Sequence, residues 1–318
     1  MTGLRRRIAI VALIFGIIAV LAGCHRLVEP ENPSISVCAS FWPVYALTDA
    51  VMADVPDATL GLMAQPQDGC LRDYAISDWD AAMLARADAV ILGGRGLESF
   101  ESALFSLGDS GPAVSAVLYN LELYRSDRPA DGESESHLNG PNPHLYLSLD
   151  GAKQIVDSIC ATMQSLDPAY AQAYIQNAQR AAERLDRLLA DNRALLADFA
   201  DRKVVLMNEA LIYPALDYGL EVADWIDRES GTGLYDRELE QCLERLKAAD
   251  ARVILIERQA PQALTEALEA AGFAVARLDV FSAHRQGEGF DIYLERQSAN
   301  AQAIYDAFTR ADSMEAAH

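Results

Sequence analysis

Polar side chains that could bind a cation follow two of the apolar segments that are typical of buried strands. Asn208 and Glu209 come directly after the segment at 203–207 (KVVLM), and Asp279 ends the segment at 273–279 (FAVARLD). In open parallel sheets, ligands bind beyond the carboxyl ends of the strands. If both segments are strands of such a sheet, we expect these three side chains to line a common cleft.

His144 is one of five histidines in the chain, and two prolines crowd it in the stretch GPNPHLYLSLDGAK at 140–153. It precedes a short apolar segment and a helix-like run, so it could join the carboxylates in the same cleft. An imidazole and several carboxylates that converge on one point are a ligand set for a divalent metal ion. For each residue taken alone, a structural histidine, a helix cap or a surface charge is the commoner explanation. The hypothesis of a metal site therefore rests on their convergence.

Strand-like and helix-like segments alternate in both halves of the chain. Strands are expected at 34–41, 58–63, 88–94, 203–207, 220–224, 251–257 and 273–279, and helices at 43–52, 77–87, 237–249, 261–272 and 292–311. Such alternation is typical of parallel sheets with crossover helices. Pro43 suits a first helical turn, and Gly272 suits a helix stop. We therefore predict an α/β fold with a parallel sheet in each half.

A single long helix is predicted between the two halves, at 167–200, where no glycine or proline follows Pro168. Apolar residues recur there at a spacing of three and four, which marks one buried face. At 1.5 Å per residue the helix would be roughly 48 Å long, more than the width of a small domain. We interpret it as the connection between two α/β lobes. A coiled-coil dimer is the alternative, and it is disfavoured because the chain contains one such segment only.

The first residues predict export and a lipid anchor. A basic start, MTGLRRR, is followed by 15 apolar residues at 8–22 and by the stretch LAGC, which ends at Cys24. The apolar run is short for a membrane span, which needs roughly 20 residues, and suits the core of a signal peptide. Small residues before the cysteine resemble a lipobox, in which the cysteine is acylated and begins the mature chain. We therefore expect a signal peptide at 1–23 and a lipid-anchored linker at 24–34, with the protein on the extracytoplasmic face of the cell membrane. An uncleaved anchor or a plain signal is the alternative.

The composition disfavours some classes of partner. Apolar residues make up 51% of the chain, enough to bury sizeable cores, and the formal net charge of −21 disfavours nucleic acids and anionic lipid surfaces. The cysteines after Cys24 show no CxxC pairing, which excludes a dense disulfide framework. Either one bridge or buried thiols would fit these cysteines, which are Cys38, Cys70, Cys160 and Cys242.

Several segments occur together in an order that resembles a known family. They are the lipobox, SFWPVYALTDAV at 40–51, DYAISDWDAAMLARADAVILGGRGLESF at 73–100, NPHLYLSLDGAKQI at 142–155, the long helix, NEALIYPALDYGLEV at 208–222, VILIERQ at 253–259 and LDVF at 278–281. Together they resemble the metal-receptor lipoproteins of bacterial zinc and manganese ABC importers. The resemblance implies two α/β lobes, at 35–166 and 201–318, joined by one long helix. It also implies a monomer without enzymatic activity, which holds one zinc or manganese ion between the lobes and delivers it to an ABC permease and its ATPase.

The family has four metal ligands in these segments, and the chain matches two of them. The resemblance makes His144 the second ligand and Asp279 the fourth. The first position, the histidine of a His-Asp-Tyr segment, holds Arg72 in this chain. The third position, a histidine or a glutamate, holds Asn208, with Glu209 beside it. The resemblance therefore implies a metal site that is altered at two positions.

Arg72 is the most consequential of these changes. A guanidinium about 4 Å from a divalent ion would be repelled by roughly 8 kcal/mol at an effective dielectric constant of about 20, and arginine cannot lose its proton. In a rebuilt metal site we therefore expect Arg72 to pair with Asp279 when the metal is absent and to leave when it enters. The candidate ligands of a rebuilt site are His144, Asp279, Glu209 and Asn208, with a further ligand from Cys70, His137 or His284.

Two other functions are weighed against a metal receptor. In the first, the same fold has changed its ligand, and Arg72 binds a carboxylate or a phosphate through its two-pronged guanidinium. The second is an enzyme, which we do not favour. The chain shows no nucleophile–base pair, and the stretch GGRGLE at 93–98 lacks the spacing of a phosphate-binding glycine loop.

Overall fold

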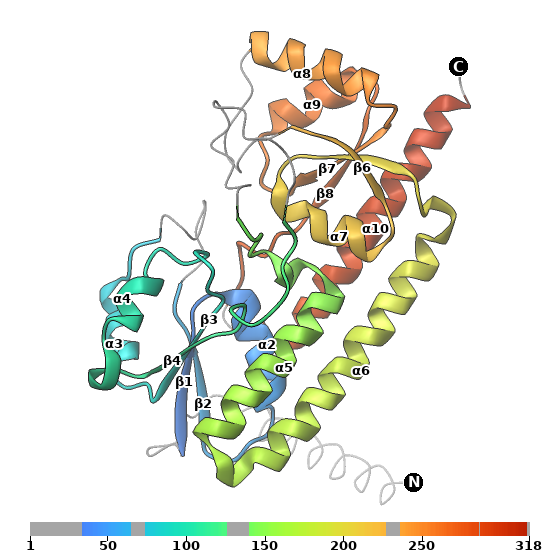
Figure 1. Ribbon diagram of the computed structural model, residues 1–318. Coiled ribbons are helices and arrows are strands. Elements are labelled where there is room, and N and C mark those ends of the chain that lie inside the picture. Colours follow the sequence, from blue (N-terminus) through green and yellow to red (C-terminus); the bar gives the residue numbers. More distant parts are fainter. Residues whose placement is uncertain (1–33, 65–73, 126–139, 227–235, 286, 317–318) are drawn as a thin grey trace, which may run out of the picture.

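The computed structural model describes residues 34–64, 74–125, 140–226, 236–285 and 287–316. Figure 1 shows two α/β lobes, one above the other, with long helices running beside both. The predicted α/β fold, with two parallel sheets and a long connecting helix, is confirmed. No helix in the described ranges is long and apolar enough to cross a membrane.

The first lobe is built on a four-stranded parallel sheet in the order β2-β1-β3-β4. Its strands are β1 (Ile35–Ala39), β2 (Ala58–Leu62), β3 (Ala89–Leu92) and β4 (Ala113–Ala116). Its helices are α2 (Trp42–Met52), α3 (Asp78–Leu84), α4 (Glu101–Phe105) and α5 (Leu149–Leu166). Every residue of β3 is buried, as expected for the apolar run of a parallel strand covered on both faces. Strand β4 was not predicted from the sequence, because it is short and its residues are only partly buried.

The second lobe repeats this architecture with the strand order β6-β5-β7-β8. Its strands are β5 (Lys203–Leu206), β6 (Glu221–Trp225), β7 (Val253–Glu257) and β8 (Ala274–Leu278). Its helices are α7 (Ile212–Asp217), α8 (Asp236–Ala248), α9 (Gln262–Ala270) and α10 (Phe290–Glu315). As predicted, α9 ends just before Gly272, which has a φ of +93° that most other residues avoid.

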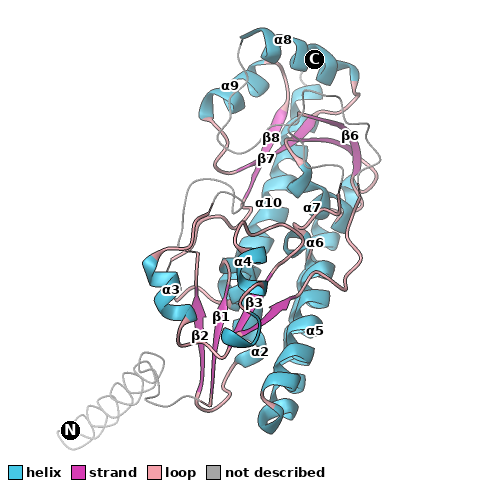
Figure 2. Ribbon diagram, turned by 60° about the vertical axis from the view of Figure 1, so that its left-hand side comes forward, coloured by secondary structure: helices cyan, strands magenta, loops and turns pink. Residues whose placement is uncertain are grey.

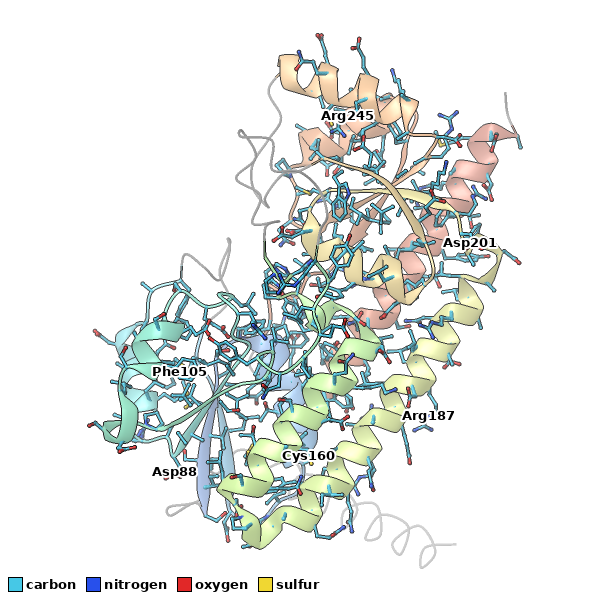
Figure 3. The ribbon with its side chains drawn as sticks, viewed as in Figure 1. Asp88, Phe105, Cys160, Arg187, Asp201 and Arg245 are labelled. Carbon is cyan, nitrogen blue, oxygen red and sulfur yellow. The ribbon has the colours of Figure 1, made fainter. Side chains whose placement is uncertain are left out.

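Two buried asparagines fasten the connecting helix, α6 (Ala171–Leu195), to the two lobes. Asn177 Nδ2 donates to two backbone carbonyls at the end of α2, at 2.9 and 2.7 Å. Asn192 Nδ2 donates to the hydroxyl of Tyr218 in the second lobe, at 3.1 Å. With 25 residues, α6 is about 38 Å long, enough to reach both contacts. Arg187 lies on its exposed outer face (Figure 3).

A second long helix, α10, also packs on both lobes, beside α6 (Figure 2). Near its start, Tyr293 Oη donates to the Tyr146 carbonyl of the first lobe at 2.6 Å, and Gln297 Nε2 donates to the Leu147 carbonyl at 3.3 Å. One turn further on, Asn300 bonds to the backbone of Asp279 in the second lobe. The sequence predicted a closing helix at 292–311 but not this contact with the first lobe.

We expect the lobes to move little when a ligand binds. Wide hinge motion needs a few loop residues that absorb the change, whereas α6 and α10 are continuous helices that contact both lobes. Small-angle X-ray scattering with and without saturating zinc or manganese should give the same radius of gyration within error. A change of several ångströms would contradict this rigidity.

The cysteines in the described part of the chain are buried thiols outside any disulfide bond: Cys38, Cys160 and Cys242. Burial raises the pKa of the Cys38 thiol to about 12, so this thiol is unreactive at neutral pH. The sequence left open either one disulfide bridge or buried thiols, and these three cysteines are buried thiols. Cys24 and Cys70 lie outside the described residues.

Candidate functional site

The carboxyl ends of strands from the two lobes meet at the lobe boundary. The ring of Trp42, which begins α2 directly after β1, lies 5.5 Å from the ring of Phe281, which follows β8. Tyr146, from the 3₁₀ turn that precedes α5, lies 6.4 Å from the same Phe281 ring. The loops that carry the predicted site residues therefore face one another across this boundary, as the rule for parallel sheets predicts.

His144 is half-buried at this boundary, and Asn142 sets the orientation of its ring. Asn142 Oδ1 accepts from the backbone N–H of His144 at 3.0 Å and lies 2.9 Å from the ring Nδ1. Its Nδ2 donates to the carbonyl of Glu209, in the second lobe, at 2.8 Å. Because Oδ1 can only accept, Nδ1 must carry a proton, which puts the lone pair of the neutral imidazole on Nε2. Histidines that bind metals are commonly held by such a hydrogen bond to the other ring nitrogen.

The short apolar segment after His144 is a turn that leads into a helix. Leu145–Leu147 form a 3₁₀ turn, and the helix-like run after it is α5. Tyr213 of α7 supports this segment, because its buried hydroxyl donates to the Asn142 carbonyl at 2.7 Å. Burial raises the pKa of Tyr213 to about 12, so the hydroxyl keeps its proton for this bond.

Asp217, the last residue of α7, caps the start of α5 from the other lobe. Ser148 Oγ donates to Oδ1 at 2.7 Å, and the Leu149 N–H donates to Oδ2 at 2.6 Å. Burial raises the pKa of Asp217 to about 6, although both hydrogen bonds oppose that shift. The segments that carry His144 and Glu209 are thus fastened together at Asn142 and again at Asp217.

Asn208 is half-buried, and both ends of its side-chain amide are engaged. Its Oδ1 accepts from the N–H of Ala210 at 3.2 Å, and its Nδ2 donates to Glu257 Oε1 at 2.5 Å. It therefore caps the 3₁₀ turn at Glu209–Leu211 in this structure. Glu257, the last residue of β7, also accepts from Gln259 at 2.9 Å.

Asp279 is buried directly after β8, and its two carboxylate oxygens face different partners. Oδ1 accepts from the N–H of Phe281 at 2.8 Å, and Asn300 of α10 bonds to the Asp279 backbone on both sides. Oδ2 faces two guanidinium groups, with Arg258 Nη1 at 3.2 Å and Arg296 Nη1 at 3.7 Å. The carboxylate is therefore positioned by the backbone and neutralised by arginine.

The backbone N–H groups of the glycines after β3 bind a carboxylate of the chain itself. The N–H groups of Gly93 and Gly94 donate to the buried Glu98 at 2.7 and 2.9 Å, and Ser40 Oγ donates to it at 2.6 Å. Burial raises the pKa of Glu98, and the three hydrogen bonds oppose that shift. The N–H groups of these glycines therefore stabilise the loop in which they lie.

Four of the predicted residues lie outside the described part of the chain: Arg72, Cys70, His137 and Cys24. The predicted ion pair between Arg72 and Asp279 lies outside it too. His284 lies half-buried in the loop after β8, where burial lowers its pKa and favours the neutral ring. Within the described ranges, no three His, Cys, Asp or Glu side chains lie close enough together to hold a metal ion.

Four residues that shape this site were not predicted from the sequence: Asn142, Asp217, Arg258 and Arg296. Arg258 could have been predicted, because it directly follows β7. Ligands bind beyond the carboxyl ends of parallel strands, and this strand-end rule, which selected Asp279, applies to Arg258 equally. Asn142 lies two residues before His144, a spacing at which asparagine commonly bonds to the chain ahead of it. For Asp217 and Arg296, we find no local signal in the sequence.

Two α/β lobes that meet at their strand ends, with polar groups gathered at the boundary and long helices along both, define a two-lobed substrate-binding protein. More particularly, the chain belongs to the ZnuA family, described as "Zinc-uptake complex component A periplasmic", which matches residues 37–307.

Individual relatives agree with this assignment. A Treponema pallidum (strain Nichols) protein is 23% identical over 317 residues, which cover 96% of this chain and 98% of the relative. The zinc-binding lipoprotein AdcA of Streptococcus pneumoniae serotype 4 is 23% identical over 255 residues, 78% of this chain. The substrate-binding protein FpvC of Pseudomonas aeruginosa, solved in complex with Mn²⁺, has a TM-score of 0.73 and 25% identity, covering 87% of this chain and 99% of FpvC.

The AdcA relatives are longer proteins than this chain. The match spans 50% of AdcA from Streptococcus pneumoniae and 38% of AdcA from Streptococcus pyogenes serotype M1. The activity of the whole AdcA protein therefore does not transfer to this chain by similarity alone.

Proposed function

We propose that this protein captures a divalent metal ion, zinc or manganese, between its lobes and delivers it to an ABC permease and its ATPase. Family membership supports the class of substrate, since AdcA is named as zinc-binding and FpvC was solved with Mn²⁺. The protein acts as a monomer that binds and transfers its cargo without a catalytic step.

The proposal rests on the way in which the His144 ring is held in this chain. The ring of His144 is held at the lobe boundary by Asn142, whose amide also reaches the Glu209 carbonyl of the opposite lobe. That arrangement directs the Nε2 lone pair of a neutral imidazole, the form in which histidine binds metals. Asp279 Oδ2 and the carboxylate of Glu209 are the oxygen donors that we assign beside it. Such a nitrogen and oxygen set suits zinc and manganese.

Metal content and titration test this function directly. Protein purified without chelators should contain about one zinc or manganese ion per chain by elemental mass spectrometry. After the metal is stripped, calorimetric titration with each ion should give saturable binding. The proposal is wrong if the purified protein carries neither ion and the stripped protein takes up neither.

A second candidate is a non-metal, anionic ligand bound by the same fold. The observation in its favour is the pair of guanidinium groups, from Arg258 and Arg296, that face Asp279 Oδ2. Guanidinium groups bind carboxylates and phosphates well. Titration with inorganic phosphate and with acetate separates the two candidates, because binding of an anion without binding of any divalent ion would replace the metal function.

We also propose that the mature chain begins at Cys24 and is tethered by lipid to the extracytoplasmic face of the cell membrane. Changing Cys24→Ala should release the protein from membranes or leave its signal uncleaved, as membrane fractionation and intact mass would show. Cys160→Ala is the matched control, because this thiol lies inside the first lobe (Figure 3). Normal processing and tethering of the Cys24→Ala variant would contradict the lipoprotein assignment.

A further inference from the structure

The two arginines at Asp279 differ in how firmly they are held. The side chain of Arg296 is 18% exposed, and its Nη2 lies 2.5 Å from Glu288 Oε2. Its guanidinium also donates to the Ala283 carbonyl and lies over the ring of Trp42, with its central carbon 4.5 Å from the ring centroid. Arg296 thus ties the loop after β8 to the first lobe and cannot move away without losing all of these contacts.

Arg258 is held far less firmly. Its side chain is 57% exposed, and among the described residues its guanidinium contacts Asp279 alone, through a single nitrogen at 3.2 Å. Because the arginine end of this ion pair lies in solvent, holding it in place contributes little to stability. If Arg258 turned out toward solvent, its guanidinium would regain water and nothing else in the described structure would be disturbed.

The two oxygens of Asp279 also differ. Oδ1 accepts from the backbone N–H of Phe281, whereas Oδ2 has the arginine contacts. A cation that binds this carboxylate without disturbing the backbone must therefore approach Oδ2, where it meets the guanidinium of Arg258. A divalent cation there would add its charge to those of the two guanidinium groups and repel both of them. Of the two, Arg258 is the one that can leave without breaking another described contact.

We propose that Arg258 is a displaceable counter-ion of Asp279, which holds Oδ2 when the cleft is empty, turns out when a divalent cation binds, and thereby sets the affinity for that cation. Arg296 remains in place in both states and positions the carboxylate. This inference rests on the proposed metal-binding function. It assigns the control of this affinity to Arg258, which directly follows β7.

Titration of Arg258→Ala with Mn²⁺ and Zn²⁺ tests the inference. At low salt the variant should bind each ion roughly fivefold to tenfold more tightly than the parent, because the competing ion pair is gone. The gain should shrink as salt is raised, since exposed ion pairs are screened. Arg258→Lys should stay close to the parent, because the contact uses one nitrogen and an ammonium can replace it.

Arg285→Ala is the matched control, since it removes an exposed positive charge from the loop after β8. It should leave the affinity nearly unchanged, which separates direct competition from a general change in charge. If the parent binds metal and Arg258→Ala binds it no more tightly, or if Arg285→Ala gains as much, the inference is overturned and the proposed function stands. If neither the parent nor any variant binds Mn²⁺ or Zn²⁺, the proposed function itself fails and this inference fails with it.

Discussion

Replacing Asp279 by alanine should weaken the binding of zinc and manganese by about 100-fold or more. The change removes the oxygen donor at Oδ2 and also leaves the fixed guanidinium of Arg296, now 3.7 Å from that oxygen, without its carboxylate partner there. A guanidinium about 4 Å from a divalent ion is repelled by roughly 8 kcal/mol at an effective dielectric constant of about 20. Calorimetric titration of metal-stripped protein would measure the loss.

Asp291→Ala provides the matched control for that experiment. It removes the same charge from the first turn of α10, but its carboxylate is 77% exposed and pairs with Arg184 at 2.8 Å on the surface. The control should bind metal as the parent does, and both variants should unfold at similar temperatures. Should Asp279→Ala bind zinc and manganese as tightly as the parent, Asp279 is not a ligand and the proposed site must be abandoned.

Most of the fold could be predicted because its signals are local. Ser77 caps α3 by accepting from the N–H of Asp80, whose carboxylate accepts in return from the Ser77 N–H, and Pro43 lies in the first turn of α2. These short-range patterns mark element ends without any knowledge of the tertiary structure. The elements that the sequence did not mark are those whose burial depends on distant partners, such as β4 beside β3.

The site could be predicted in part, because the strand-end rule locates loops but not the contacts that their side chains make. It selected Asn208 correctly as a residue at the carboxyl end of β5, yet in the structure its amide caps a turn and bonds to Glu257. The partner of Asn208 comes from a different strand, 49 residues further along the chain. No spacing in the sequence indicates such a pairing.

The charges around Asp279 likewise could not be predicted from the spacing of residues in the sequence. The altered ligand position drew attention to Arg72, which lies outside the described residues. Within the described part of the chain, Oδ2 faces Arg258 and Arg296, which the sequence did not indicate. Arg258 lies on a neighbouring strand end and Arg296 on α10. A single sequence read along its length does not reveal that three elements bring these charges together.

Replacing Asp217 by alanine should lower the free energy of unfolding by about 3 kcal/mol. The carboxylate accepts from Ser148 Oγ and from the N–H of Leu149, and the residue is buried, so alanine leaves these donors without their acceptor at the start of α5. Arg193 would keep its bond to the backbone carbonyl of residue 217 at 2.7 Å, which limits the damage to the side chain. Chemical denaturation at pH 7 would measure the effect. A loss below about 0.5 kcal/mol, typical of surface positions, would contradict the cap.

The same carboxyl group should make stability depend on pH in a direction opposite to that of most acidic residues. Burial raises the pKa of Asp217 from its ordinary 3.8 to about 6, with the nearby Asp150 adding to the shift and Arg193 opposing it. Between these values the folded chain retains the proton and the unfolded chain loses it, so this contribution to stability is complete below pH 4 and is lost as the pH rises through 6. Asp217→Asn cannot titrate, although its amide can still accept from Leu149 and donate to Ser148. The stability of the Asn variant relative to the parent should therefore increase by about 2 kcal/mol between pH 4 and pH 7. A difference between the two proteins that stays constant over this range would show that Asp217 does not titrate in the folded state.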